Sequence, residues 1–330
     1  MATQPATVPT LGSSRSAFTD RAFSTLALGA GLTVLLILGL IALSTTNQAL
    51  PAFRQEGLGF ITSDRWIPSQ DVFGALPFVY GTMVISVIAL LFAVPVSMGI
   101  ALFLSELAPP RLRRPVVYLI DLLAAVPSVV FGLWGLLVLT QPGPGGGDPP
   151  IVGFYQWISN VTGSIPGLST LFGPPLNGKS FFLAGVILAL MITPIITSLI
   201  REVYNTVPRG HKEAALALGA TRWEMIRMAV FPYGRSGIVS AAMLGLGRAL
   251  GETLAVTLVL SPAILYSFNL IGAQNPSTIA SNIALQFPEA SGLEVSVLIA
   301  TGLVLFLITF VVNFAARAVV NRRSEFSGAN

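Results

Sequence analysis

Six long stretches with almost no charged side chains limit what this sequence can fold into. They cover residues 23–43, 76–104, 116–140, 180–200, 234–265 and 295–316. Each is long enough to cross the roughly 30 Å hydrocarbon core of a bilayer as an α-helix, which takes about 20 residues. Strands of a membrane β-barrel would instead alternate polar and apolar side chains over about 10 residues. The sequence therefore predicts an all-α integral membrane protein, built as a bundle of six transmembrane helices.

The composition excludes soluble and disordered classes. Charged residues make up only 10% of the chain and hydrophobic residues 53%, whereas a soluble domain carries roughly 25% charged residues. Disordered chains are poor in apolar residues. The absence of cysteine excludes thiolate metal sites and cysteine nucleophiles, and the lone His211 cannot form a histidine cluster. No nucleophile–base pair stands out, so we expect a chain that is not an enzyme and holds no metal.

The basic residues predict the orientation, because cytoplasmic loops are rich in Lys and Arg. With the N-terminus inside, 14 of the 18 Lys and Arg residues fall in the cytoplasmic segments, which are 1–22, 105–115, 201–235 and 317–330. The first stretch is longer than the apolar part of a signal peptide and lacks a small-residue cleavage site, so we expect it to be retained. The sequence thus predicts a membrane domain over 23–316 between two cytoplasmic tails, 1–22 and 317–330.

Residues 173–180 match the GxxxxGK[ST] pattern of a phosphate-binding loop letter for letter. That loop needs a preceding strand and a following soluble helix, so that backbone N–H groups converge on the phosphate. Here the surroundings are rich in Pro and Gly, and both Pro174 and Pro175 lack an N–H donor. The predicted topology also places the loop outside the cell. We therefore expect no nucleotide site there.

The longest cytoplasmic segment, residues 201–235, has the pattern of two short helices separated by a turn. Pro208 suits the first turn of a helix, and the Ala/Leu-rich residues after it favour one. Gly219 suits the left-handed position that ends a helix. Thr221 and Glu224 have the spacing of a capping box that opens the next helix.

This segment resembles the EAA loop of the membrane subunits of ATP-binding-cassette importers. Five residues carry the match: Glu213, Ala214, Ala215, Gly219 and Pro232. The chain departs from the pattern at Ala229 and Phe231, which is a mild hydrophobic change. In that family the helix before the glycine is a coupling helix that sits in a groove of the ATPase subunit. The resemblance implies that these five residues dock an ATPase, and we expect Pro232 to close the second short helix.

A pair of charges lies inside the fifth stretch. Arg248 and Glu252 are four residues apart, so on a continuous helix they would share one face. A charge at that depth costs several kcal/mol and has to face the bundle interior or a wet cavity. Gly245, Gly247 and Gly251 would let a neighbouring helix pack closely. The pair is either structural or an anion site, in which the guanidinium binds phosphate oxygens and the carboxylate orients it or accepts a proton.

The fifth stretch is similar to the fifth-helix motif of bacterial phosphate importer permeases, and residues 121–134 are similar to their third helix. The resemblance extends over about residues 75–310, and the sequence after Glu252 is closer to the PstC type of subunit than to the PstA type. The resemblance implies that Arg248 and Glu252 line the substrate path. Four hydroxyl residues are further candidates for that path: Ser128, Thr193, Thr197 and Thr253.

The resemblance implies a permease subunit of an ATP-driven phosphate importer in the bacterial plasma membrane. Its partners would be a PstA-like second permease, a PstB-like ATPase dimer that binds ATP and Mg, and an external PstS-like phosphate-binding protein. The chain itself would need no cofactor, would contact membrane lipid and would bind no nucleic acid. A PstA-type subunit, or a permease for molybdate or sulfate, is the alternative within this class. A stand-alone secondary transporter or channel would usually show repeated halves with broken helices, and no such repeat is visible.

Overall fold

The computed structural model describes residues 14–57, 59–143, 146–261, 263 and 267–324. Over these residues the chain is helical apart from its loops and one isolated bridge between Ile67 and Val72, in agreement with the predicted all-α class. The α-helices are α1 (Ser14–Glu56), α2 (Gly59–Thr62), α3 (Leu76–Leu102), α4 (Pro110–Ala124), α5 (Ser128–Trp134), α6 (Pro150–Thr162), α7 (Leu168–Leu171), α8 (Phe181–Asn205), α9 (Arg209–Ala217), α10 (Arg222–Met225), α11 (Phe231–Leu250), α12 (Leu254–Val259), α13 (Ile279–Gln286) and α14 (Leu293–Ser324). Three π-helical segments and one 3-10 turn complete the regular structure, over Phe103–Leu107, Gly135–Leu139, Ile226–Val230 and Pro68–Gln70.

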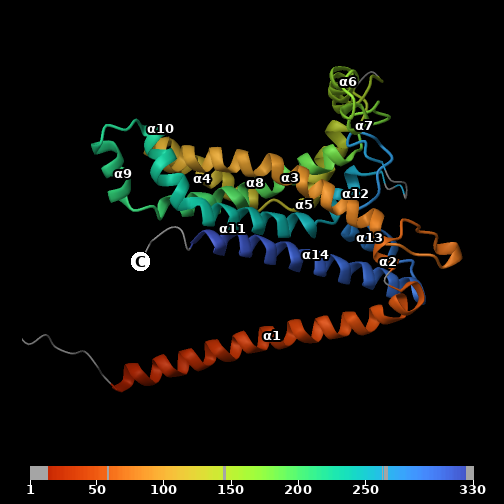
Figure 1. Cartoon of the computed structure of the whole chain (residues 1–330), viewed down its shortest axis with the longest axis horizontal. Coiled ribbons are helices and arrows are strands. Elements are labelled where there is room, and N and C mark those ends of the chain that lie inside the picture. Colours follow the sequence, from red (N-terminus) through yellow and green to blue (C-terminus); the bar gives the residue numbers. More distant parts are fainter. Residues whose placement is uncertain (1–13, 58, 144–145, 262, 264–266, 325–330) are drawn as a thin grey trace, which may run out of the picture.

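The long helices lie along the long axis of the molecule (Figure 1). The short helices α9 and α10 lie at one end, together with the described start of α1 and the end of α14. The helices α2, α6 and α7 lie at the opposite end. Near α2, Ala49 and Ala52 of α1 pack with Val297 and Leu298 of α14 in a buried cluster. From there α1 diverges from the bundle, and its apolar side chains are exposed.

The helices α3 and α8 form the centre of the bundle and run parallel. Near the start of both, the rings of Tyr80 and Phe181 meet edge to face with their centroids 5.8 Å apart. Further along, the Ser97 hydroxyl donates a 3.0 Å hydrogen bond to the carbonyl oxygen of Thr193. Since both contacts keep the same order along the two helices, the chain between them has to return across the bundle.

That return passes through α4 and α5 and is sharply bent. The axes of α4 and of the segment Ser128–Leu139 differ by 89°, so the predicted single helix over 116–140 is wrong. Pro127 stands in the break, where it lacks an N–H and disfavours helical geometry at the residue before it. The chain therefore leaves the helix after Ala124 and starts again at Ser128.

The predicted continuous helix over 234–265 is also wrong. The helix α11 ends at Leu250, and α12 begins only at Leu254 and is six residues long. Gly251 follows the last residue of α11, and Gly is the residue whose ordering in a helix costs the most backbone entropy. The two charges that the sequence places on one helix are thus separated by a helix end.

Four described helices are long and apolar enough to cross a membrane: Thr19–Glu56, Leu76–Leu107, Phe181–Asn205 and Leu293–Ala318. The bent pair of α4 and α5 is a fifth candidate. The helix α11 is not among them, and its 20 residues include Arg235 and Arg248. The chain is therefore a multi-pass membrane protein. By length and composition the described residues contain four or five candidate membrane spans, fewer than the six predicted.

Close packing of α5 against α12 predicts a difference between two glycines. A Cβ on Gly132 would lie 2.6 Å from the Cα of Ala255, whereas a Cβ on Gly247 would meet nothing within 4 Å. We expect Gly132→Ala to lower the free energy of unfolding by about 1–3 kcal/mol, because backbone has to shift. Gly247→Ala should be neutral or slightly stabilising, since Ala favours a helix. Thermal unfolding of the detergent-solubilised protein measures both, and equal melting temperatures would contradict this packing.

Candidate functional site

The segment between α8 and α11 forms the first predicted short helix, α9, and the predicted turn after it, at which Gly219 ends α9. Gly219 has a φ of 85°. Its N–H donates to the carbonyl oxygen of Leu216, and the N–H of Ala220 donates to that of Ala215. This is the hydrogen-bond pattern of a Schellman motif, whose left-handed position favours Gly. The structure therefore confirms Gly219 as the stop of α9.

A capping box opens α10. The N–H of Glu224 donates to the Thr221 hydroxyl at 3.3 Å, and the Glu224 carboxylate accepts from the N–H of Thr221 at 2.8 Å. The hydrogen bonds from the backbone and hydroxyl of Thr221 hold the pKa of the Glu224 carboxyl below its ordinary value. The predicted capping box is confirmed, and together with Gly219 it sets the turn between α9 and α10.

Pro232 does not close a helix, contrary to the prediction. Helical geometry continues from α10 through the π-helical segment Ile226–Val230 into α11. A proline lacks an N–H, and its ring crowds the carbonyl group four residues earlier. The wider π turn directly before Pro232 accommodates both effects. The turn after α9 is therefore connected to α11 by one uninterrupted helical path.

The residues of the EAA pattern face different surroundings. Glu213, Ala214 and Pro232 are exposed, whereas Ala215 is half-buried and packs against the main core. Leu218, directly after α9, is 90% exposed. A single exposed apolar side chain is common on a protein surface, so only the position of Leu218 beside α9 makes it a candidate for an interface. Helix propensity alone did not reveal the exposure of Leu218. The signal that could have done so is an apolar residue directly beside the turn glycine.

An ion pair connects α9 to the end of α3. Nζ of Lys212 lies 2.6 Å from Oε1 of Glu106, and the side chains are 20% and 9% exposed. This is the only ion pair among the described residues. It fixes α9 to α3 directly, while the link over residues 206–208 fixes α9 to α8. The sequence did not reveal this contact, because 105 residues separate its partners.

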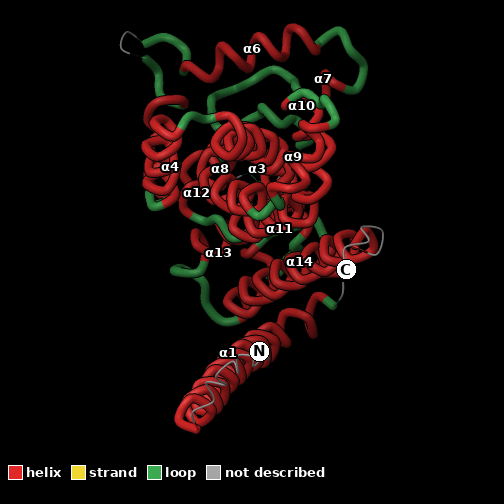
Figure 2. The backbone as a smooth tube through the Cα atoms, turned by 90° about the vertical axis from the view of Figure 1, so that its left-hand side faces the viewer, coloured by secondary structure: helices red, strands yellow, loops and turns green. Residues whose placement is uncertain are grey.

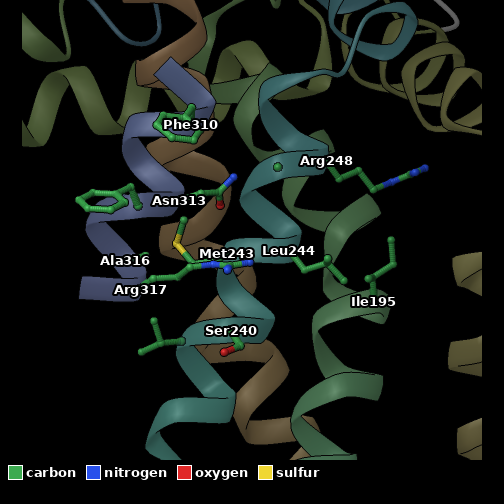
Figure 3. Close-up of a pocket in the computed structure, with 12 residues that line it drawn as sticks. Ile195, Ser240, Met243, Leu244, Arg248, Phe310, Asn313, Ala316 and Arg317 are labelled. Atoms are coloured by element: carbon green, nitrogen blue, oxygen red, sulfur yellow. The ribbon is translucent and has the colours of Figure 1, made fainter. Parts of the chain in front are cut away.

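A cleft opens between α8, α11 and α14 (Figure 3). Its volume is about 1190 Å³. The polar groups on its mostly apolar walls are those of Ser240, Arg248, Asn313 and Arg317. Figure 3 shows Arg317 reaching from α14 toward α11, whereas Arg248 points to the side of α8 on which Ile195 lies. The two arginines therefore border the cleft at separate places, and their guanidinium groups do not converge on one point.

Arg248 borders the cleft but does not pair with Glu252. Arg248 lies in the last turn of α11 and is exposed. Glu252 follows the break, is 9% exposed, and accepts a 3.2 Å hydrogen bond from the N–H of Ala255 in the first turn of α12. The prediction that both charges lie on one helix face is wrong, because α11 ends between them. Of the glycines expected to admit a neighbouring helix, Gly245 meets α8, whereas Gly247 lines the cleft.

The four predicted hydroxyl residues do not line this cleft. Thr193 and Thr253 each donate to a backbone carbonyl oxygen of their own segment. Ser128 is half-buried at the start of α5. Thr197 is 1% exposed, and its hydroxyl has no hydrogen-bond partner among the described residues. It lines a small separate pocket that Arg201 also lines.

The segment that matches a phosphate-binding loop caps the start of α8 instead. Residues 173–179 form neither helix nor strand, and Ser180 is the N-cap of α8. Its hydroxyl oxygen accepts from the N–H of Leu183 at 3.1 Å and shares a 2.7 Å hydrogen bond with the hydroxyl of Tyr155. Burial raises the pKa of the Tyr155 hydroxyl. The serine that would meet a metal–phosphate complex thus serves the start of a membrane helix.

Comparison with known families identifies the chain. The model of the binding-protein-dependent transport system inner membrane component matches residues 93–325, which include the turn after α9 and the cleft. The chain belongs to this family. The match decides against the stand-alone transporter or channel.

Curated relatives narrow the family. The phosphate transport system permease protein PstC of Mesorhizobium japonicum is 42% identical over 316 residues, which are 96% of this chain and 94% of the relative. PstC of Xylella fastidiosa is 43% identical, covering 95% of this chain and 94% of its own. PstC 2 of Mycobacterium tuberculosis is 43% identical over 91% of each chain. These relatives confirm the predicted resemblance and its preference for PstC over PstA.

Solved structures share the fold. A chain of a bacterial alginate ABC transporter, in complex with a periplasmic protein bound to an alginate pentasaccharide, superposes with a TM-score of 0.61 at 17% identity, covering 93% of this chain and 96% of that chain. A chain of the MetNI methionine ABC transporter gives 0.51 at 16% identity over 74% and 93%. At this identity the likeness concerns the fold alone, which is that of an ABC importer permease.

The ion pair between α9 and α3 predicts a coupling energy. We expect Lys212→Met and Glu106→Gln each to lower the free energy of unfolding, and the double variant to lose about 1–3 kcal/mol less than the sum, because the pair is partly buried. A double-mutant cycle of denaturant unfolding in detergent measures this. Additive effects would mean that the two charges do not interact.

Proposed function

We propose that this chain is a permease subunit of an ATP-driven importer of inorganic phosphate and forms half of its translocation path. The observation that carries the proposal is 42% identity to a PstC phosphate permease over 96% of the chain. The relatives reported above are named for phosphate, which favours this anion over molybdate or sulfate. An exposed surface at α9 and a cleft bordered by arginines are the parts that such a subunit needs.

We infer six membrane crossings with both termini in the cytoplasm and the chain in the bacterial plasma membrane. The four long apolar helices, the bent pair of α4 and α5, and α11 make up the six. In support of α11, it lies between α8 and α14 in both views of the backbone (Figures 1 and 2). The start of α1 and the end of α14 lie at the end that carries α9 (Figure 1). Most of the Lys and Arg residues belong to the segments at this end, which favours the cytoplasmic side.

The work is divided between subunits. An external PstS-like protein delivers phosphate, a PstA-like permease forms the other half of the path, and a PstB-like ATPase dimer binds ATP and Mg and hydrolyses the nucleotide. This chain hydrolyses nothing and binds the ATPase through α9. Displacement of α9 reaches α3 through the Lys212–Glu106 pair and α11 through the uninterrupted helix around Pro232.

Arg248 is proposed to bind phosphate in the path. Arg248 is exposed and lines the cleft, and its guanidinium has no carboxylate within 4.0 Å among the described residues. A planar guanidinium offers paired N–H donors that match two phosphate oxygens. Because Glu252 caps α12 instead of neutralising Arg248, the positive charge stays available to the anion.

Replacing Arg248 tests the path. We expect Arg248→Gln to lower ATP-driven phosphate uptake by at least about tenfold, since a charge-assisted hydrogen bond to the anion is lost. Arg235→Gln is the control, because Arg235 lies on the same helix, is exposed and does not line the cleft. Uptake is measured in proteoliposomes that contain the assembled complex. If Arg248→Gln takes up phosphate at the wild-type rate, Arg248 does not bind phosphate in the path and its role is structural.

Substitutions at two adjacent alanines distinguish an effect on ATPase docking from an effect on folding. We expect Ala214→Trp to weaken association with the cognate ATPase and to leave the melting temperature unchanged, because Ala214 is exposed. Ala215→Trp should instead lower the melting temperature, because Ala215 packs against the core. Co-purification with the ATPase and thermal unfolding are the two measurements. Full ATPase retention by Ala214→Trp would sink the docking role of this face.

A further inference from the structure

A second basic groove lies between the start of α4 and the end of α8. Its volume is about 470 Å³. Three arginines line it, Arg113 and Arg114 from α4 and Arg201 from α8, and Val117 and Tyr118 form part of its apolar wall. The proposed phosphate path does not use this groove.

The three guanidinium groups have no acidic partner. The only ion pair among the described residues joins Lys212 and Glu106, so no described carboxylate lies within 4.0 Å of the three arginines. Arg113 is held in place by a 3.1 Å hydrogen bond to the side-chain oxygen of Asn205. Three like charges that share one groove repel one another, and an anion between them removes that repulsion.

A buried hydroxyl adjoins the groove. Arg201 and Val117 also line a small inner pocket, together with Thr197. The Thr197 hydroxyl is buried and has no hydrogen-bond partner in the part of the chain that the structure describes, which costs free energy unless a partner arrives. Asp121, an exposed residue, also lines this pocket. This negative charge repels an anion from the inner pocket and keeps it in the outer groove, beside the arginines.

The groove is separate from both parts of the proposed transport machinery. Viewed from the end that carries α9, α4 and α9 lie on opposite sides of α3 and α8 (Figure 2). The cleft beside Arg248 is formed by α8, α11 and α14, and no residue of α4 lines it. An ATPase docked on α9 therefore does not require the groove, and neither does an anion in the cleft.

The surroundings of the groove suit a ligand at a membrane surface. Arg201 lies near the end of the membrane helix Phe181–Asn205. Along α4, the side chains of Tyr118, Leu119 and Leu122 are each more than 60% exposed. Basic pockets at the cytoplasmic ends of membrane helices bind phosphate-bearing lipid headgroups, and apolar side chains beside them meet the acyl chains.

We propose that the groove formed by Arg113, Arg114 and Arg201 is a binding site for a phosphoryl group. Paired guanidinium groups match the oxygens of a phosphate monoester or diester. The group is carried either by an anionic phospholipid or by free inorganic phosphate. The exposed apolar face of α4 continues directly from the groove and suits the acyl chains of a phospholipid.

The test compares Arg113→Gln/Arg201→Gln with Arg111→Gln/Arg222→Gln, which removes the same number of charges from exposed positions at the same end of the molecule but none from the groove. Native mass spectrometry of the purified full chain counts phosphatidylglycerol and phosphatidylcholine molecules retained. Equilibrium dialysis measures inorganic phosphate. We expect the first variant to lose about tenfold or more in affinity for one of the two phosphoryl ligands, and the second variant to lose less.

The outcomes decide both the site and its ligand. Loss of phosphatidylglycerol, with phosphatidylcholine unchanged, supports a lipid site; loss of bound inorganic phosphate supports an ion site. The proposal would be overturned if the two double variants lost equal affinity. It would also be overturned if neither phosphatidylglycerol binding nor phosphate binding changed in Arg113→Gln/Arg201→Gln. Asp121→Asn provides a check that does not depend on removing an arginine, since loss of the repelling carboxylate should strengthen binding several-fold. Because Arg248 is unchanged in every variant, failure here leaves the transport proposal standing.

Discussion

The parallel packing of α3 against α8 is the contact on which the rest of the bundle depends. Ile88 fills the space that Gly185 leaves open, and the Ser97 hydroxyl bonds to the backbone of α8. Both helices continue to the end of the molecule that carries α9. There Glu106 at the end of α3 binds Lys212, and α8 leads directly into α9. A displacement of α9 is thus transmitted directly to α3 and α8, as the proposed docking of an ATPase on α9 requires.

The two broken helices meet each other beside this pair. The segment α5 crosses α12 where Gly132 lies against Ala255, next to the carboxylate of Glu252 that caps α12. Non-helical backbone at membrane depth is tolerated only where it is buried in protein or lines a cavity. In transporters such breaks often mark the substrate site. Here the break after α11 leaves Arg248 in the last turn of that helix, at the edge of the cleft.

The sequence predicts the elements that depend on local chemistry and misses those that depend on tertiary contacts. Charge-free length indicated the membrane helices, and the Gly219 stop and the Thr221–Glu224 capping box follow from residue type and spacing. The break at residues 251–253 was missed, because hydropathy does not change where a helix stops inside the membrane. At Pro232 the error is the reverse, since a helix end was predicted where the helix continues. A π turn accommodates the proline, and residue type alone does not predict such a turn. The Lys212–Glu106 pair and the groove at Arg201 join distant segments, so only the fold brings them together.

The central claim is that phosphate passes the cleft beside Arg248, and a single thiol tests it directly. The chain contains no cysteine, and Gly247 lines the cleft with free space where a side chain would start. We predict that Gly247→Cys in the assembled complex reacts with a membrane-impermeant maleimide, and that phosphate slows this reaction during turnover. Gly153→Cys on α6 is exposed and its added side chain also meets nothing, so it should react at a rate that phosphate does not change. A Gly247→Cys thiol that stays unlabelled, or labels at a rate independent of phosphate, would contradict the account.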